Sequence, residues 1–269
     1  MATSAACNTI PPVTVADYKE KGTWETVADF PVYITGPPTP TTALLLIYDA
    51  FGVSPQTLQG VDLLSSALSP LNTTVIMPDF FRGNAAKAAW FSPDAGEAEA
   101  AEKAVFWAHA TEYEKWSQVT RDLVAELRKK WEGVEGWGSL GLCWGGKLAM
   151  EEGGWWMMLL TFVCVAVTSG KDTPWKVSGQ VHPGALKKED AGAITIPHIV
   201  LASNGEDATV VQQYKDILEN GKNGVVETYP TMHHGWMGAR ANLSNDDNLK
   251  EYARGYNQCA SFFAEHLNA

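Results

Sequence analysis

A cysteine flanked by glycines is the residue of this sequence best placed for covalent chemistry. Cys143 lies within the stretch GLCWGG, residues 141–146, between an apolar segment and residues that favour a helix. Glycines two positions before and after a nucleophile allow the sharp, strained turn that presents it between a strand and a helix. The start of that helix favours a thiolate and stabilises an oxyanion. The pattern predicts a nucleophilic thiol, although a buried cysteine in a glycine-rich turn would have the same letters.

Acids and histidines that suit such a thiol follow later apolar stretches. Residues 196–203 lead into Glu206 and Asp207, and residues 225–229 lead into His233 and His234. An imidazole can take the thiol proton, and a carboxylate fixes the tautomer and orientation of the imidazole. The order nucleophile, acid, histidine therefore predicts a catalytic triad.

These side chains need a scaffold that brings the ends of several strands together. Strand patterns occur at residues 22–34, 42–48, 73–77, 137–142, 177–181, 196–203 and 225–229, and helical patterns at 54–68, 84–110, 112–131, 210–220 and 249–267. The alternation predicts a doubly wound, mostly parallel α/β sheet in a single domain, residues 1–269. Ligands of such sheets bind at the carboxyl ends of the strands, where Asp49, Cys143 and the acids and histidines above all fall.

Composition excludes several classes of function. The chain has 269 residues and a formal charge of −11, which argues against binding of nucleic acid or acidic membranes. Its four cysteines, at positions 7, 143, 164 and 259, are too scattered for a zinc site or a disulfide scaffold. The first residues lack a basic region and a long apolar core, so we expect a reducing, cytoplasmic location. The apolar segment 155–167 is too short to span a bilayer, which needs about 17–25 residues, and we expect it to be buried.

Several stretches together resemble a known family. They are IYDAFG (47–52), PQTLQG (55–60), MPDFFRG (77–83), GLCWGGK (141–147), GQVHP (179–183) and HGWM (234–237). From about residue 7 to the end, the chain resembles the fungal branch of the dienelactone hydrolase family. The resemblance implies an α/β-hydrolase fold and hydrolysis of a lactone or small ester, either dienelactone-like or a polyketide-type lactone, through an acyl-cysteine. It implies no metal or organic cofactor.

The resemblance also implies roles for individual residues. Cys143 would be the nucleophile and His234 the base, with the backbone N–H groups of Ala50 and Trp144 as oxyanion donors. Asp49 would contact the cysteine and control its activation when substrate binds, unless it only forms a turn. The other implied role is substrate binding. Arg82 and Arg240 would bind a carboxylate of the substrate, and Phe51 and Trp236 would also contact the substrate. His233 and His182 are expected to be structural.

The chain departs from the family pattern in two places. The family's acid aligns with Gly205, and a shift of two residues gives Asp207, which we prefer, with Glu206 in reserve. Residues 151–169 are longer and richer in tryptophan and methionine than expected, which suggests an insertion that reshapes the pocket or forms a homodimer surface.

The doubtful acid keeps two alternatives open. One is a non-hydrolytic cyclase, isomerase or dehydratase of fungal secondary metabolism on the same scaffold. The other is a non-catalytic small-molecule binding module, which would lack a fast, pH-dependent thiol.

Overall fold

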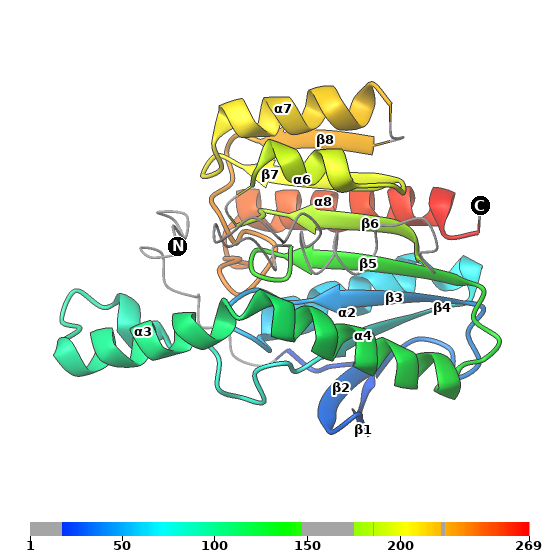
Figure 1. The fold of residues 1–269 in the computed structure, drawn as a ribbon, viewed down its shortest axis with the longest axis horizontal. Helices are drawn as coiled ribbons and strands as arrows, with labels where there is room; N and C mark the ends of the chain where they lie inside the picture. The colour runs from blue at the N-terminus through cyan, green and yellow to red at the C-terminus, as the bar shows by residue number, and fades with distance from the viewer. Residues whose placement is uncertain (1–17, 147–174, 185, 222–223, 269) are drawn as a thin grey trace, which may run out of the picture.

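An eight-stranded sheet forms the centre of the molecule (Figure 1). The computed structural model describes residues 18–146, 175–184, 186–221 and 224–268. The strands are β1 (Thr23–Val27), β2 (Phe30–Thr35), β3 (Thr42–Ile47), β4 (Thr73–Pro78), β5 (Gly136–Leu142), β6 (Trp175–Val181), β7 (His198–Ser203) and β8 (Gly224–Tyr229). Their order across the sheet is β1-β2-β4-β3-β5-β6-β7-β8.

The sheet is mostly parallel, as the alternating pattern predicts. β1 pairs with β2 and β2 with β4 in antiparallel fashion, whereas every pair from β4 across to β8 is parallel. Every residue of β3, β4 and β5 is buried, because helices cover both faces of these strands. The carboxyl ends of β3, β5, β6, β7 and β8 consequently lie along one edge.

Helices cover the sheet on both sides. In Figure 1, α2 (Pro55–Ala67) and α8 (Asp246–His266) lie behind the sheet, whereas α4 (Tyr113–Lys130) and α6 (Lys188–Ala193) lie in front of it. α7 (Ala208–Glu219) contacts α6 and β8. The start of α2 follows the expected rule, since Ser54 caps it by accepting a hydrogen bond from the Thr57 amide and Pro55 takes the first position.

The structure corrects the helix predictions in two places. The predicted helix over 84–110 begins only at Glu97, as α3 (Glu97–Ala110), and a short 3-10 turn, η2 (Ala88–Phe91), precedes it. Pro93 and Gly96 lie between the two, and both residues disfavour a continuous helix. The six-residue helix α6 was not predicted, because one and a half turns give too little apolar periodicity to detect.

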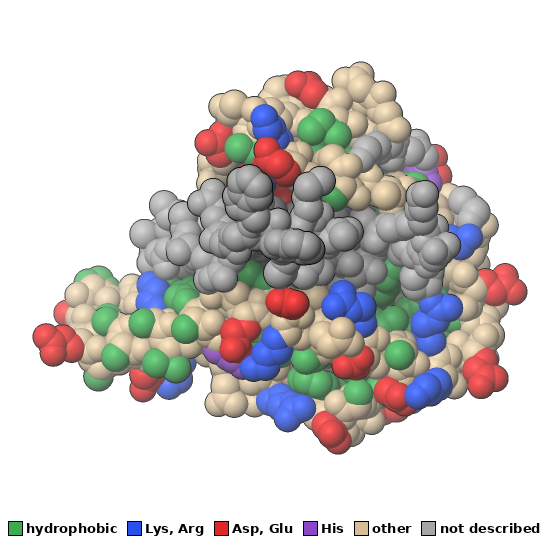
Figure 2. Space-filling model, in the orientation of Figure 1, with side chains coloured by type: hydrophobic (Ala, Val, Ile, Leu, Met, Phe, Trp, Pro, Cys, Tyr) green, Lys and Arg blue, Asp and Glu red, His purple; other side chains and the backbone are tan. Residues whose placement is uncertain are grey.

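Helix α3 projects beyond the end of the sheet as an arm (Figure 1). Figure 2 shows hydrophobic side chains along its outer surface, and Val105 is 71% exposed. An aromatic cluster ties the base of the arm to the body. The indole of Trp144 packs on Phe81 at 4.5 Å between ring centroids, and its Nε1–H donates to the Ala110 carbonyl at 2.8 Å. The residue after Cys143 thus anchors the last turn of α3.

The segment 151–169, predicted to be an insertion, and its apolar part 155–167 lie outside the described residues.

Candidate active site

Cys143 sits on the tight turn that its flanking glycines predict. It follows β5 directly, and its φ is +50°, in the left-handed region that non-glycine residues rarely adopt. A Cβ on Gly141 would lie 2.2 Å from the Gly145 carbonyl oxygen, and one on Gly145 would lie 2.3 Å from that of Ile47. Side chains at either glycine would therefore push apart the backbones that make this turn.

His234 joins the thiol to a carboxylate. Its Nε2 lies 3.1 Å from Cys143 Sγ, and its Nδ1 lies 2.7 Å from Glu206 Oε1. A carboxylate only accepts hydrogen bonds, so Nδ1 carries a hydrogen and Nε2 is the atom that can take the thiol proton. All three side chains are buried, with His234 and Glu206 exposing 0% and 3% of their side chains.

The acid at His234 is Glu206 and not Asp207, which the sequence analysis preferred. The Glu206 carboxylate also accepts hydrogen bonds from the Ser203 amide and, at 3.0 Å, from the Ser203 hydroxyl. Asp207 is exposed and caps α7, where its Oδ1 accepts from the amides of Thr209 and Val210 at 2.8 and 3.2 Å. The turn after β7 thus points Glu206 toward His234, whereas Asp207 caps the helix that follows.

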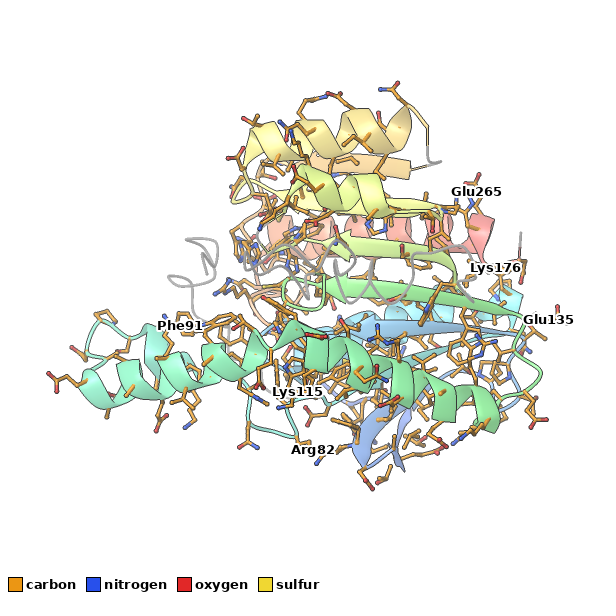
Figure 3. The ribbon with its side chains drawn as sticks, in the orientation of Figure 1. Arg82, Phe91, Lys115, Glu135, Lys176 and Glu265 are labelled. Atoms are coloured by element: carbon orange, nitrogen blue, oxygen red, sulfur yellow. The ribbon has the colours of Figure 1, made fainter. Side chains whose placement is uncertain are left out.

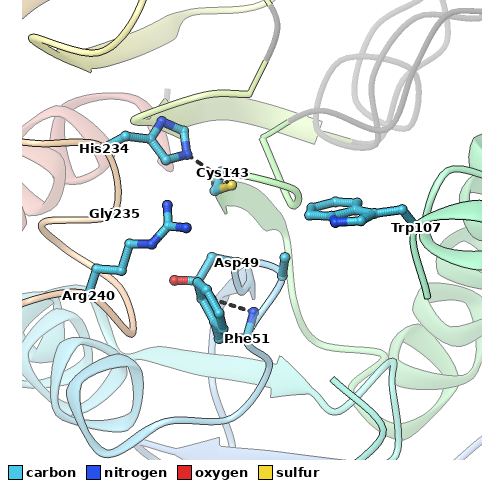
Figure 4. A pocket seen from close by; sticks show the side chains of 8 residues that line it. Asp49, Phe51, Trp107, Cys143, His234, Gly235 and Arg240 are labelled. Atoms are coloured by element: carbon cyan, nitrogen blue, oxygen red, sulfur yellow. Dashed lines mark hydrogen bonds between the residues drawn. The ribbon is translucent and has the colours of Figure 1, made fainter. Parts of the chain in front are cut away.

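A pocket opens beside the thiol (Figure 4). Arg240 and Trp107 approach Cys143 from different sides, and Phe51 forms part of the wall. The residues that line it are Asp49, Ala50, Phe51, Trp107, Cys143, His234, Gly235 and Arg240. They surround about 230 Å³ of space that holds no protein atoms and is open to solvent.

The two expected oxyanion donors flank the nucleophile. Ala50 lines the pocket together with Cys143, and Trp144 is the next residue on the turn. The Gly145 amide donates to the Tyr48 carbonyl at 3.2 Å, which holds this turn against the loop that carries Ala50. Both residues therefore lie on loops next to Cys143.

Asp49 lies in the same pocket, but its oxygens are engaged by backbone amides. Oδ1 accepts from Phe51 at 2.9 Å and Oδ2 from Ala239 at 2.8 Å. Burial raises the pKa of this carboxyl, while the two amides and the nearby charge of Arg240 act in the opposite direction. Asp49 therefore joins the loop after β3 to the loop that carries Arg240.

The two arginines expected at a substrate carboxylate differ in position. The Arg240 guanidinium is buried in the pocket, 4.9 Å from the ring centroid of Phe51. Arg82 is exposed and lies over Phe30 at 4.3 Å, and Figure 3 places it at the lower edge of the molecule. Its φ is +50°, and Arg82 is not among the residues that line the pocket.

Trp236 is also misplaced by the sequence analysis. It is fully buried, stacks on Tyr229 at 4.4 Å between ring centroids, and does not line the pocket. His233, expected to be structural, has Nε2 3.1 Å from the Arg240 carbonyl oxygen, and burial lowers its pKa. Both residues shape the loop that presents His234.

The sequence analysis missed the contribution of the arm. Trp107 of α3 lines the pocket, and the ammonium of Lys103 lies 4.2 Å from the ring centroid of Phe91. Arg240 approaches the same ring at 5.9 Å. Burial lowers the pKa of Lys103, and the charge of Arg240 adds to this effect. The alanine-rich sequence indicates a helix here. It does not show which residues of that helix lie at the pocket.

The described residues hold no group of three or more histidine, cysteine, aspartate or glutamate side chains arranged to bind a metal ion. No helix in the described ranges is long and apolar enough to cross a bilayer.

Comparisons with known proteins agree with this architecture. The dienelactone hydrolase family model matches residues 30–157. An uncharacterized AIM2 family protein of Schizosaccharomyces pombe is 30% identical over 236 residues, which cover 87% of this chain and 86% of that protein.

Solved structures establish the fold. A dienelactone hydrolase from Anabaena variabilis has a TM-score of 0.58 at 13% identity, covering 93% of this chain and 98% of that one. The esterase Pf2001 of Pyrococcus furiosus has a TM-score of 0.58 at 11% identity, covering 96% and 100%. The expected α/β-hydrolase fold is confirmed.

Family and fold together support a hydrolase. The nucleophile turn, the sheet and the family match over residues 30–157 lead to the same assignment. The chain belongs to the dienelactone hydrolase family.

Proposed function

We propose that the protein hydrolyses a small lactone or carboxylic ester through an acyl-cysteine intermediate. The observation that carries the proposal is the buried series of contacts from Cys143 Sγ through the His234 ring to Glu206. In this proposal the triad is Cys-His-Glu. The carboxylate at His234 supports it over the non-hydrolytic and non-catalytic alternatives, which rested on the doubt about the acid.

In the first half of the reaction, His234 Nε2 takes the thiol proton and Sγ attacks the carbonyl carbon of the substrate. The amides of Ala50 and Trp144 stabilise the oxyanion that forms. When the intermediate collapses, the carbon–oxygen bond breaks and the leaving oxygen takes the proton from His234. The acyl group remains on sulfur as a thioester.

In the second half, His234 takes a proton from water and the hydroxide attacks the thioester carbonyl. The carbon–sulfur bond breaks, the acid product leaves, and the proton returns to Cys143. Glu206 holds the correct tautomer of His234 throughout and stabilises its positive charge. Asp49 acts in this scheme by fixing the loop of Arg240 through the Ala239 amide.

The pocket favours a small substrate with an acceptor group, such as a carboxylate, away from the reacting carbonyl. The buried guanidinium of Arg240 can bind a carboxylate, and Phe51 and Trp107 offer flat apolar walls. Lys103 adds a second positive charge near Arg240 on the side of Phe91. This local positive charge lies within a protein of net charge −11.

Substitution of the nucleophile tests the proposal. Cys143→Ala should reduce turnover of lactones and esters by roughly 10³-fold or more, and Cys143→Ser should fold but lose most activity because serine needs a stronger base. Turnover and the mass of the acylated protein after rapid quenching are the measurements. Cys259→Ala is the matched control, since Cys259 is buried and burial raises its pKa to about 12. Wild-type turnover by Cys143→Ala would refute covalent thiol catalysis.

A further inference from the structure

A second buried histidine adjoins the triad. His182 follows β6, is 0% exposed, and neither of its ring nitrogens has a hydrogen-bond partner among the described residues. A buried polar group without a partner costs roughly 1–3 kcal/mol, and an apolar residue of similar size would avoid this cost. Since the two nitrogens make no hydrogen bond, what His182 contributes at this position is the contact of its ring with neighbouring side chains.

The backbone at His182 is strained as well. Its φ is +37°, while its amide still donates to the Leu201 carbonyl at 2.7 Å and so continues the pairing with β7. Strained backbone at a non-glycine residue persists only where the surroundings enforce it, and it is common at functional sites. His182, next to the nucleophile turn, therefore combines a strained backbone with buried ring nitrogens that make no hydrogen bond.

The ring of His182 packs against the ring of His234. Their centroids are 5.2 Å apart and their planes cross at 65°, an edge-to-face arrangement. The two nitrogens of the His234 ring face Cys143 Sγ and Glu206 Oε1. His182 therefore supplies the third contact that fixes the plane of the base.

His182 stays neutral in this position. Burial lowers its pKa well below the ordinary value, and the charges of His234, Arg240 and His233 act in the same direction. An edge-to-face contact between two neutral rings is favourable, whereas a charged His182 would repel the cation that forms on His234. His234 becomes a cation when it takes the thiol proton, so a neutral ring beside it favours the charged pair.

We propose that His182 is a positioning residue whose neutral ring holds the plane of His234 and stabilises the imidazolium that forms opposite the Cys143 thiolate. The proposal rests on the proposed function, because it assigns His182 a part in the same proton transfer. It requires the ring of His182 and not its nitrogens.

Two variants separate the ring from the rest of the side chain. His182→Phe keeps an aromatic ring without nitrogens, and His182→Asn removes the ring but suits a positive φ. We expect His182→Asn to raise the pH midpoint of iodoacetamide alkylation of Cys143 by about one unit, equivalent to a tenfold change in proton affinity. We expect kcat to fall roughly tenfold with it, and His182→Phe to stay within about threefold of wild type in both measurements.

A third variant controls for the loss of any buried histidine. His198 is also 0% exposed, lies at the start of β7, and pairs with the Ser178 hydroxyl at 2.7 Å. Since the site lies at the other end of the strand, His198→Gln should lower the melting temperature without moving the alkylation midpoint. If His182 were only structural, His182→Asn would likewise lower the melting temperature without moving the alkylation midpoint.

Two results would overturn the inference. One is an unchanged midpoint and kcat in folded His182→Asn, and the other is equal impairment of His182→Phe and His182→Asn. Should His182→Asn fail to fold, an impaired but folded His182→Phe overturns the inference and a near wild-type one supports it. Failure of the proposed function is seen separately, as turnover that survives Cys143→Ala.

Discussion

Glu206 acts through the ring of His234, and its surroundings are arranged for that contact. The Ser203 amide and hydroxyl both donate to its carboxylate, which fixes the carboxylate where Oε1 meets Nδ1. These two donors hold the Glu206 carboxylate in one orientation. The carboxylate in turn fixes the orientation of the His234 ring. Asp207, one residue further, has an unrelated task at the start of α7.

The adjacent acids give a matched pair of variants. Glu206→Gln should reduce kcat by roughly 10²- to 10⁴-fold, because an amide no longer enforces the reactive tautomer of His234. Asp207→Ala should leave kcat near wild type but lower the free energy of unfolding by about 0.5–2 kcal/mol through loss of the helix cap. Kinetics and urea unfolding of both variants test this assignment. The reverse pattern, with Asp207→Ala inactive, would contradict it.

The sequence sufficed to pair Cys143 with His234, which are in contact, but not to choose the acid that contacts His234. The glycines around the cysteine and the position of the histidine after a strand each have a direct physical meaning. The choice between Glu206 and Asp207 depends on how the turn after β7 closes, and their side chains differ by one methylene. Only the observed hydrogen bonds of Ser203 and of the first α7 amides resolve that choice.

Helix α3, and not the loop after β4, brings side chains to the pocket and a positive charge close to Arg240. Its base is held by the Trp144 indole, and from there it brings Trp107 to the pocket and Lys103 beside Phe91. Figure 3 shows Phe91 close to α3 and Arg82 far from it. The second positive charge near Arg240 therefore comes from the arm.

Two cation variants test this difference between elements. Lys103→Ala should raise KM for a carboxylate-bearing lactone about five- to tenfold, with a much smaller effect on a neutral ester of the same size. Arg82→Ala should leave both KM values near wild type, since its guanidinium lies over Phe30. Steady-state kinetics on the two substrates provide the measurement. An effect of Arg82→Ala larger than that of Lys103→Ala would contradict the assignment.

The elements themselves were predictable to different degrees. The buried strands stand out as short apolar runs, because burial on both faces removes polar residues from them. The order of the strands, in which β4 lies between β2 and β3, was not predicted. The arm was harder to place, since its direction is set by long-range contacts of Trp144 and Trp116 that no local pattern encodes.

Across the whole molecule, buried neutral histidines link stability to pH. Burial lowers the pKa of His198 to about 3, and the pKa of His182 is also far below its ordinary value. The unfolded chain binds protons at these residues below about pH 6.5, whereas the folded chain does not. Their neutral form therefore contributes stability that is complete above pH 6.5 and lost as the pH falls toward 3.

Net charge acts in the opposite direction over the same range. The chain has a formal charge of −11 at pH 7 and a sequence pI near 5.0, so acidification to pH 5 removes much of its self-repulsion. The free energy of unfolding of the wild type alone, measured as the pH falls, would combine the effect of the histidines with that of the net charge. A variant that changes only one histidine separates them, because the net charge at pH 7 stays the same.

His198→Gln provides that separation. At pH 7 the variant should be less stable than wild type because it loses the ring that pairs with Ser178. Between pH 7 and pH 5 the wild type should lose about 2 kcal/mol that the variant does not, since a buried neutral histidine costs ~1.4 kcal/mol for each pH unit below its unfolded pKa. The gap between the two free energies of unfolding, measured by urea titration at both pH values, should narrow by that amount. A constant gap would show that the folded protein takes up a proton at His198 as readily as the unfolded chain, and hence that this end of β7 is open to water.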